Sequence, residues 1–286
     1  MQPILRSYLY CSGTRLEQHF DKAIHSNADA VIIELEDGIA HNKKSTARHA
    51  VVERLENISV AKPVFVRINS FDSGLAIDDL EALASLPLTG IRIAKVSCAE
   101  EVKRAAHILR KYQFKGNIQL MIESACALSN INDIVQADPM VSLVTLGEAD
   151  FCADVFCDMD SRVIDYARSQ VVIASRTADL LPPVLSGSRF INDDDFVTKT
   201  SLHAKNMGFW GRTCIHPSQI DIVNKVFTIS SEEIEYAQHV IKLMNEAFLQ
   251  GQTTVVDGDN NYINIWTKRR AERILFLAGI HIRGKE

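Results

Sequence analysis

The sequence predicts a (β/α)8 barrel with extra helices at its C-terminal end. Short, uniformly apolar runs recur along the 286 residues, and segments with helical periodicity separate them. Strands that are apolar on both faces are typical of parallel sheets, whose faces are covered by helices. Several runs end in acidic residues, as expected where the loops of a barrel converge on a binding site. We place the barrel at residues 1–230 and a helical extension at residues 231–286, packing on the barrel or on a neighbouring subunit.

The first half of the chain supplies four strands, each followed by a helix. The predicted strands are residues 6–11, 30–35, 64–68 and 90–96, and the helices are residues 15–25, 45–56, 78–86 and 100–112. Thr14 is the expected N-cap of the first helix, because its hydroxyl can accept a hydrogen bond from the first turn. In the second helix, Ala47, Val51 and Leu55 recur every fourth residue and form one apolar face.

The second half completes the barrel and adds the extension. Its predicted strands are residues 118–122, 141–146, 183–185 and 211–215, and its helices are residues 162–178, 196–207, 232–249 and 266–278. Strand 183–185 has the least support, because two prolines precede it and prolines disrupt a central ladder. Gly208 is expected to end helix 196–207. A polar turn at residues 257–261 separates the last two helices.

Composition excludes several classes of function. Hydrophobic residues make up 47% and charged residues 23%, as in an ordinary globular protein. The net charge of -5 argues against a general nucleic-acid binder, which needs a basic surface. No apolar stretch approaches the ~20 residues of a membrane span, and no secretory signal is visible, so we expect a cytoplasmic protein. The six cysteines contain no C-x-x-C pair, and we expect reduced thiols.

Charged residues gather at the carboxyl ends of the predicted strands, which share one rim of a barrel. They are Glu36, Asp37, Arg67, Lys95, Glu123, Glu148 and Asp150. Clustered acids raise one another's pKa, and a hard cation such as Mg²⁺ relieves this because it prefers oxygen ligands. The alternative is that each acid caps the helix that follows it. Arg67 presents a fork suited to a carboxylate or keto acid, or else forms a surface salt bridge.

Covalent catalysis and nucleotide hydrolysis have little support. The chain has no G-x-S-x-G or Walker-type loop, and no cysteine has a histidine beside it in sequence. His216, in the segment CIHPSQI, has either a catalytic or a structural role.

A series of motifs runs along nearly the whole chain. In order they are RSYLYCSG, IELEDGI, KKSTAR, VRIN, IAKV, MIESA, LGEADFCAD, the pair Ala167 and Arg168, and GRTCIHPSQI. The series resembles, in the same order, the citrate lyase beta subunit and its relatives, which include malyl-CoA and citramalyl-CoA lyases within the HpcH/HpaI aldolase superfamily. A single motif such as LEDG is weak, but the ordered series that ends in CIHPSQI is specific.

The resemblance implies a (β/α)8 barrel, a homotrimer or hexamer, that uses Mg²⁺ to cleave a 3-hydroxy-acyl-CoA thioester. It implies that Glu123 and Asp150 hold the metal and that Arg67 binds the keto-acid half of the substrate. Site residues implied by position are Arg67, Glu36, Asp37 and Asn264 for catalysis, and Arg67, Lys95 and Gly147 for substrate binding. CoA enters as part of the substrate, and an acyl carrier protein is a conceivable partner. Lys44 and Arg48 either face the CoA phosphates or lie on a solvated helix face.

Departures from the family pattern keep several functions open. Ala149 stands where an acid usually precedes the metal ligand, and Phe156 where glycine is common. Asn264 replaces the aspartate that the lyases use for proton transfer, and an amide cannot take or give that proton. We favour a lyase, with citramalyl-CoA preferred over malyl-CoA and citryl thioesters. The alternatives are a thioesterase or synthase on the same scaffold, and a non-catalytic or carrier-dependent beta-like subunit.

Overall fold

The computed structural model describes residues 4–56, 58 and 61–280. The chain divides into two compact units, one of residues Leu5–Phe227 and a second that consists of the segment from Thr228 onward together with the N-terminal Ile4.

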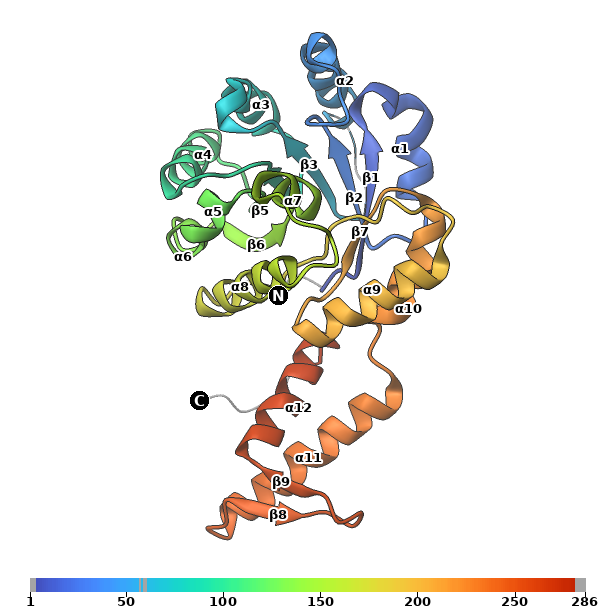
Figure 1. Ribbon diagram of the computed structural model, residues 1–286, viewed down its shortest axis with the longest axis vertical. Coiled ribbons are helices and arrows are strands. Elements are labelled where there is room, and N and C mark those ends of the chain that lie inside the picture. Colours follow the sequence, from blue (N-terminus) through green and yellow to red (C-terminus); the bar gives the residue numbers. More distant parts are fainter. Residues whose placement is uncertain (1–3, 57, 59–60, 281–286) are drawn as a thin grey trace. The chain divides into compact units, whose positions relative to one another are not determined.

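A curled parallel sheet forms the centre of the first unit (Figure 1). Within the described residues its strands are β1 (Ser7–Ser12), β2 (Ala30–Glu34), β3 (Val64–Ile68), β4 (Gly90–Ile93), β5 (Asn117–Ile122), β6 (Val141–Leu146) and β7 (Arg212–Cys214), in the spatial order β6-β5-β4-β3-β2-β1-β7. Isolated parallel bridges join Thr145 to Val184 and Leu185 to Arg212. These bridges link the two edge strands, so the predicted barrel is confirmed.

Helices surround the sheet (Figure 1). The α-helices are α1 (Leu16–Ile24), α2 (Lys44–Leu55), α3 (Ala76–Leu83), α4 (Ala99–Lys111), α5 (Ala125–Ser129), α6 (Ile131–Val135), α7 (Glu148–Val155), α8 (Arg162–Thr177), α9 (Asp194–Met207) and α10 (Ile220–Phe227). Short 3₁₀ turns are η1 (Gly13–Arg15), η2 (His41–Lys43), η3 (Phe71–Ser73) and η4 (Pro217–Gln219). The short helices α5, α6, α7 and α10 were not predicted.

One local prediction was confirmed only in part and another was wrong. The predicted seventh strand is present only as the bridges at Val184 and Leu185, because the prolines before these residues limit ladder hydrogen bonds. Thr14 is not the N-cap of α1, because it lies inside η1 and its hydroxyl is 3.1 Å from that of Ser12. The helix begins one residue later than predicted, with Arg15 at the cap position.

The core has two layers that follow the period of two in each strand. Val31 and Ile33 belong to the large cluster between the sheet and the helices. Ala30, Ile32 and Phe65 belong to a smaller cluster with Tyr8, Leu143 and Val184, and therefore point the other way, into the barrel. The same alternation directs Glu34 and Arg67, the next residues in phase, toward the interior of the barrel. Among the described residues, no helix is both long and apolar enough to cross a membrane.

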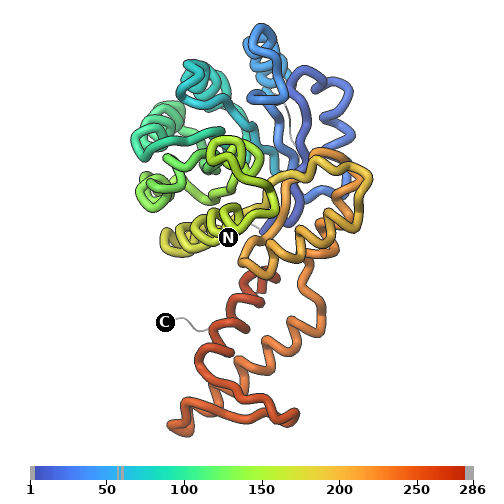
Figure 2. The backbone as a smooth tube through the Cα atoms, viewed as in Figure 1, coloured from blue at the N-terminus to red at the C-terminus, as the bar shows by residue number. Residues whose placement is uncertain are grey.

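The second unit is a pair of helices with a hairpin between them (Figure 2). It comprises α11 (Ser231–Leu249), β8 (Thr254–Val256), β9 (Tyr262–Asn264) and α12 (Ile265–Leu277). The two predicted helices are confirmed, and the predicted polar turn is the turn of the hairpin, where Asp257 accepts hydrogen bonds from the backbone of Asp259 and Asn261. Ile263 and Met244 are fully buried in a small apolar core of this unit.

Candidate active site

Glu123 lies at the carboxyl end of β5, and both of its carboxylate oxygens are buried without a hydrogen-bond partner. The residue is only 4% exposed. Burial, and then the negative charge of Asp150, raise the pKa of Glu123 to about 8. A buried, unpaired carboxylate is unfavourable unless a proton or a cation compensates its charge. Glu123 could therefore hold either a proton or a cation.

Gly147 gives the Glu123 side chain its space. A Cβ atom at position 147 would lie 2.5 Å from Cγ of Glu123 and 2.7 Å from its Oε1, closer than atoms pack. The Gly147 N–H also donates to the Ile122 carbonyl at 2.9 Å, which fixes the end of β6 beside the end of β5. The first turn of α7 follows and carries Asp150, whose side chain is 45% exposed.

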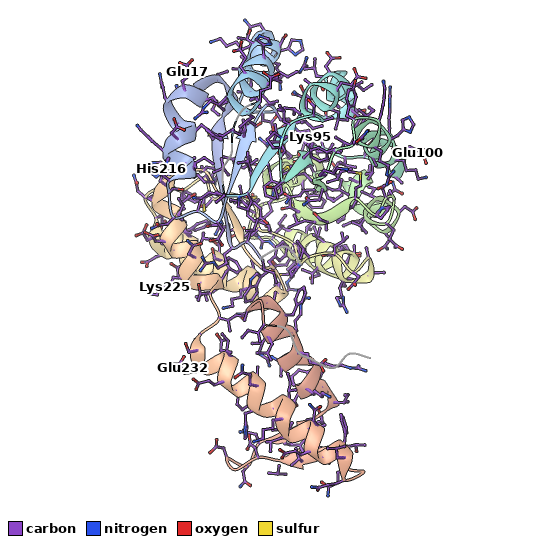
Figure 3. All side chains as sticks on the ribbon, turned by 180° about the vertical axis from the view of Figure 1, so that it is seen from behind. Glu17, Lys95, Glu100, His216, Lys225 and Glu232 are labelled. Atoms are coloured by element: carbon purple, nitrogen blue, oxygen red, sulfur yellow. The ribbon has the colours of Figure 1, made fainter. Side chains whose placement is uncertain are left out.

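Lys95 brings a positive charge among the acids of this rim. Its backbone is left-handed, with φ of 50°, directly after β4. Its Nζ lies 2.5 Å from Oε1 of Glu36 and 2.8 Å from Oδ1 of Asp37. Oδ1 of Asp150 is 4.0 Å from the same nitrogen. Figure 3 shows the labelled Lys95 over the barrel, whereas the labelled Glu17 and Glu100 lie at its periphery.

The pKa values of the neighbouring acids Glu36 and Asp37 move in opposite directions. Burial raises the pKa of Glu36, and the charge of Arg67 only partly opposes this. Burial also acts to raise the pKa of Asp37, but the hydrogen bonds with Lys95 and Glu36 and the charge of Lys95 together outweigh it, and the pKa of Asp37 is lowered. Glu36 is thus the more basic carboxylate of the pair.

Arg67 is held on several sides. Its Nε donates to Oε2 of Glu34 at 2.6 Å, and its Nη1 lies 3.4 Å from Oε2 of Glu36. Its guanidinium carbon is 5.0 Å from the centre of the Tyr10 ring. Burial acts to lower the pKa of Arg67, but Tyr10 and Glu34 outweigh it and raise the pKa. With 13% of the side chain exposed, Arg67 is not a surface salt bridge, and Nη2 has no acceptor within the described part of the chain.

Glu34 is a site residue that the sequence analysis missed. Besides binding Arg67, its Oε1 accepts a hydrogen bond from the Glu36 backbone N–H at 2.5 Å. One carboxylate therefore orients both the Arg67 guanidinium and the loop that carries Glu36 and Asp37. The signal was present in sequence, because Ala30, Ile32 and Glu34 alternate toward one face of β2.

Glu148 does not face the other rim acids. It is buried and accepts hydrogen bonds from Nε of Arg168 at 2.6 Å and from the hydroxyl of Ser186 at 2.5 Å. Lys44 and Arg48 are also engaged within the protein. Lys44 donates to the Glu36 carbonyl at 3.0 Å, and Nε of Arg48 donates to Asp79 at 2.6 Å. The side chains of Glu148, Lys44 and Arg48 therefore bind other protein groups near the rim.

Asn264 and His216 both serve as caps. Asn264 lies in the second unit, where its Oδ1 accepts a hydrogen bond from the Thr267 N–H at 3.1 Å and begins α12. His216 accepts a hydrogen bond at Nδ1 from the Ser218 N–H at 3.2 Å and begins η4. Each residue thus has a structural role at the start of a helix.

The carboxylates of Glu123 and Asp150 fit a magnesium ion better than a metal that takes all of its ligands from protein side chains. In the described part of the chain, no group of three His, Cys, Asp or Glu side chains is arranged to hold a metal ion. Glu123 and Asp150 therefore offer two carboxylates at most. Mg²⁺ accepts such a set because it usually keeps several waters. The unpartnered oxygens of Glu123 are the observation that supports this fit.

Comparison with known proteins identifies the family. Residues 6–217 match the family described as HpcH/HpaI aldolase/citrate lyase. The chain belongs to the HpcH/HpaI aldolase/citrate lyase family. Residues 179–279 also match a family described as a C-C bond lyase of the TIM-barrel fold. The resemblance inferred from the motifs is confirmed, and with it the assignment to a family of lyases.

Similar members of the HpcH/HpaI family carry names that refer to CoA thioesters. The mitochondrial citramalyl-CoA lyase of Homo sapiens is 32% identical over 261 residues, covering 84% of this chain and 76% of that protein. A (3S)-malyl-CoA thioesterase of Cereibacter sphaeroides is 32% identical over 258 residues, 88% of each chain. CitE of Mycobacterium tuberculosis, solved in complex with magnesium, acetoacetate and coenzyme A, has a TM-score of 0.78 at 25% identity and covers 96% of this chain and 98% of its own.

Proposed function

We propose that this protein is a Mg²⁺-dependent carbon-carbon lyase that cleaves a 3-hydroxy-acyl-CoA thioester into acetyl-CoA and a keto acid. Citramalyl-CoA is the preferred substrate, ahead of malyl-CoA and citryl thioesters. The observation that carries the proposal is the buried, unpartnered carboxylate of Glu123 beside Asp150. The human citramalyl-CoA lyase among the relatives supports the choice of substrate, and the magnesium and coenzyme A bound to CitE support the cofactor and the thioester.

Glu123 and Asp150 would hold the ion. When bound, Mg²⁺ supplies polarisation of the substrate oxygen that changes from hydroxyl to ketone. Gly147 keeps the Glu123 carboxylate in place because no other residue leaves room for it.

Arg67 would bind the keto-acid half of the substrate. Its Nη2 has no acceptor in the described structure, whereas Nε is occupied by Glu34, so the guanidinium can turn only its outer edge toward a substrate carboxylate. A cation fixed by buried partners loses little freedom on binding, which favours precise placement of the scissile bond.

Cleavage requires that the substrate hydroxyl lose a proton and that the departing thioester enolate gain one. Glu36 is suited to accept the first proton, because its pKa is raised and its buried Oε2 has no hydrogen-bond donor. Asp37, with a lowered pKa, stays ionised and helps to hold Lys95. Lys95 then stands as a cation beside the developing charge.

The test is chromatography of acyl-CoA species after incubation of the purified protein with Mg²⁺ and racemic citramalyl-CoA. We expect acetyl-CoA and pyruvate to appear, and we expect Asp150→Ala to abolish both. The control is Asp133→Ala, which removes an exposed acid from α6 and should leave the activity unchanged. Unchanged citramalyl, malyl and citryl thioesters would contradict the proposal.

A thioesterase is the second candidate function, and the relative named (3S)-malyl-CoA thioesterase is the observation that favours it. The same chromatogram separates the two activities. A lyase releases acetyl-CoA, whereas a thioesterase releases free CoA and an intact hydroxy acid.

Assembly into a homo-oligomer is part of the same proposal. Tyr262 and Trp266 in the second unit are 64% and 63% exposed, and aromatic residues this exposed are common at interfaces between subunits. Light scattering should then give a multiple of the 31.9 kDa chain mass. A monomer that is active only with an added acyl carrier protein would favour the carrier-dependent subunit instead.

A further inference from the structure

The C-terminal end of α7 brings two cysteines together. Phe156 adopts the left-handed conformation, with φ of 57° and ψ of 44°, and ends the helix. The N–H of Cys157 then donates to the carbonyl of Cys152 at 3.0 Å. In this type of helix ending, the residue after the left-handed position packs against the residue five positions before it. Here both of those residues are cysteines.

The two thiols are in direct contact. The Cys157 thiol donates to Sγ of Cys152, and the sulfur atoms are 3.5 Å apart. Cys152 is 6% exposed, whereas Cys157 is only partly buried. No other pair of cysteines in the described part of the chain shares a hydrogen bond. The sequence did not indicate this pair, because a spacing of five residues brings two thiols together only when the helix ends in this turn.

We propose that Cys152 and Cys157 are a reversible oxidation site that closes to a disulfide and locks the end of α7. The sulfur atoms must approach from 3.5 Å to the bond length of about 2.05 Å, which is a small movement for two side chains already joined through their backbones. The disulfide would hold a turn that is otherwise costly, because Phe156 is left-handed and 96% exposed to solvent.

A peroxide is the oxidant that balances the reaction. The Cys157 thiolate attacks one peroxide oxygen, the O–O bond breaks, and one water leaves after protonation, so that Cys157 becomes a sulfenic acid. The Cys152 sulfur then attacks the Cys157 sulfur, the S–O bond breaks, and the second water carries away the proton of Cys152. Two thiols are oxidised to one disulfide, and one peroxide is reduced to two waters.

The order of attack follows from accessibility. Cys157 reaches solvent, so it meets the peroxide first. Cys152 is buried, so the peroxide does not reach its sulfur first. Cys152 therefore acts as the resolving thiol.

The experiment treats the reduced full-length protein with hydrogen peroxide in the presence and absence of dimedone, which traps sulfenic acids, and maps the products by mass spectrometry. Cys126→Ser serves as the working background, because Cys126, Cys152 and Cys157 share one tryptic peptide that ends at Arg162. The second readout is hydrogen exchange of the Phe156 and Cys157 amides.

In this background we expect the peptide to lose two hydrogen atoms and to regain them with dithiothreitol, and we expect slower amide exchange at the turn. In Cys152→Ala we expect the dimedone adduct on Cys157, and in Cys157→Ala we expect no adduct on Cys152. Circular dichroism of each variant shows whether it is folded, and the background protein alone decides the question if one variant is not. A pair that stays reduced while Cys98 is oxidised would overturn the proposal.

Discussion

The buried carboxylate of Glu34 fixes the position of Arg67, the cation that we propose binds the keto-acid half of the substrate. We expect Glu34→Gln to weaken binding of the keto-acid half about tenfold or more, because a loss of ~1.4 kcal/mol is tenfold and breaking a buried charged pair costs at least that. The measurement is calorimetric titration with pyruvate in the presence of Mg²⁺. Glu81→Gln, at an exposed position of α3, is the matched control. Unchanged pyruvate affinity in Glu34→Gln would show that Arg67 does not depend on this ion pair.

Gly147 leaves the space that the Glu123 side chain occupies in the proposed metal site. The added methyl of Gly147→Ala must displace the Glu123 carboxylate, because the new Cβ falls 2.5 Å from Cγ of Glu123. We expect Mg²⁺ affinity to fall at least tenfold, about 1.4 kcal/mol, while the barrel stays folded. Gly258→Ala is the control, since nothing lies within 4 Å of a Cβ at that position. Equal Mg²⁺ affinity in both variants would contradict this account of the site.

At the scale of elements, substitutions of Asn264 can distinguish its structural role as a helix cap from a chemical role in turnover. Asn264→Ala removes the cap of α12 and should lower the stability of the second unit by about 1 kcal/mol. Asn264→Asp keeps a side-chain acceptor for the Thr267 N–H. Its free energy of unfolding should lie within a few tenths of a kcal/mol of the parent value, which is about the spread among good N-cap residues. Urea unfolding followed by circular dichroism tests both values. A rise in turnover in Asn264→Asp alone would support the predicted catalytic position.

The start of β1 is tied to the turn before β2 by an ion pair that depends on pH. Burial acts to raise the pKa of Asp29, but hydrogen bonds from the Arg6 side chain and backbone outweigh it, and the pKa of Asp29 is lowered. The stability from such a carboxylate is present above its unfolded pKa of about 4 and is lost as the pH falls through the lower folded value.

We therefore expect Asp29→Asn to cost about 2 kcal/mol at pH 7, as for a hydrogen bond to a charged group. The difference from the parent should shrink below pH 4, where the carboxyl of Asp29 takes up its proton. Urea midpoints measured across this pH range test the prediction. Asp72→Asn, at an exposed position, should show neither effect. A difference that is constant with pH would mean that Asp29 acts through shape alone.

The elements that sequence predicts well are those whose signal is local. The structure contains β5, β6 and α11 where they were predicted. The signals for these elements lie within the elements' own residues. The seventh strand is different, because Val184 and Leu185 pair only where the edges of the closed ring meet. The same limit applies to the pair Cys152 and Cys157, whose contact depends on a left-handed residue that is not glycine.

For the whole molecule, the order of the strands predicted which charged residues follow strand ends on one rim of the barrel. It did not predict which of these side chains contact one another. Lys95, Glu36 and Arg67 come together as the parallel register requires. Glu148 follows a strand end like Glu123, yet it turns to Arg168, because α7 begins at that residue and directs its side chain away from the rim. The alternation of side chains along β2 would have added Glu34 to the predicted site residues. Distances between strand ends follow only from the closed barrel.

Binding of Mg²⁺ should stabilise one compact unit of the chain and not the other. An ion that binds only the folded barrel raises its unfolding free energy by about 2.7 kcal/mol at a hundredfold excess over Kd. Because the chain has two compact units, calorimetry should resolve transitions that respond differently, with only the Leu5–Phe227 transition shifted upward by Mg²⁺. Asp150→Asn should remove the shift, whereas Asp133→Asn should keep it. A shift that survives in Asp150→Asn would place the ion elsewhere than between Glu123 and Asp150.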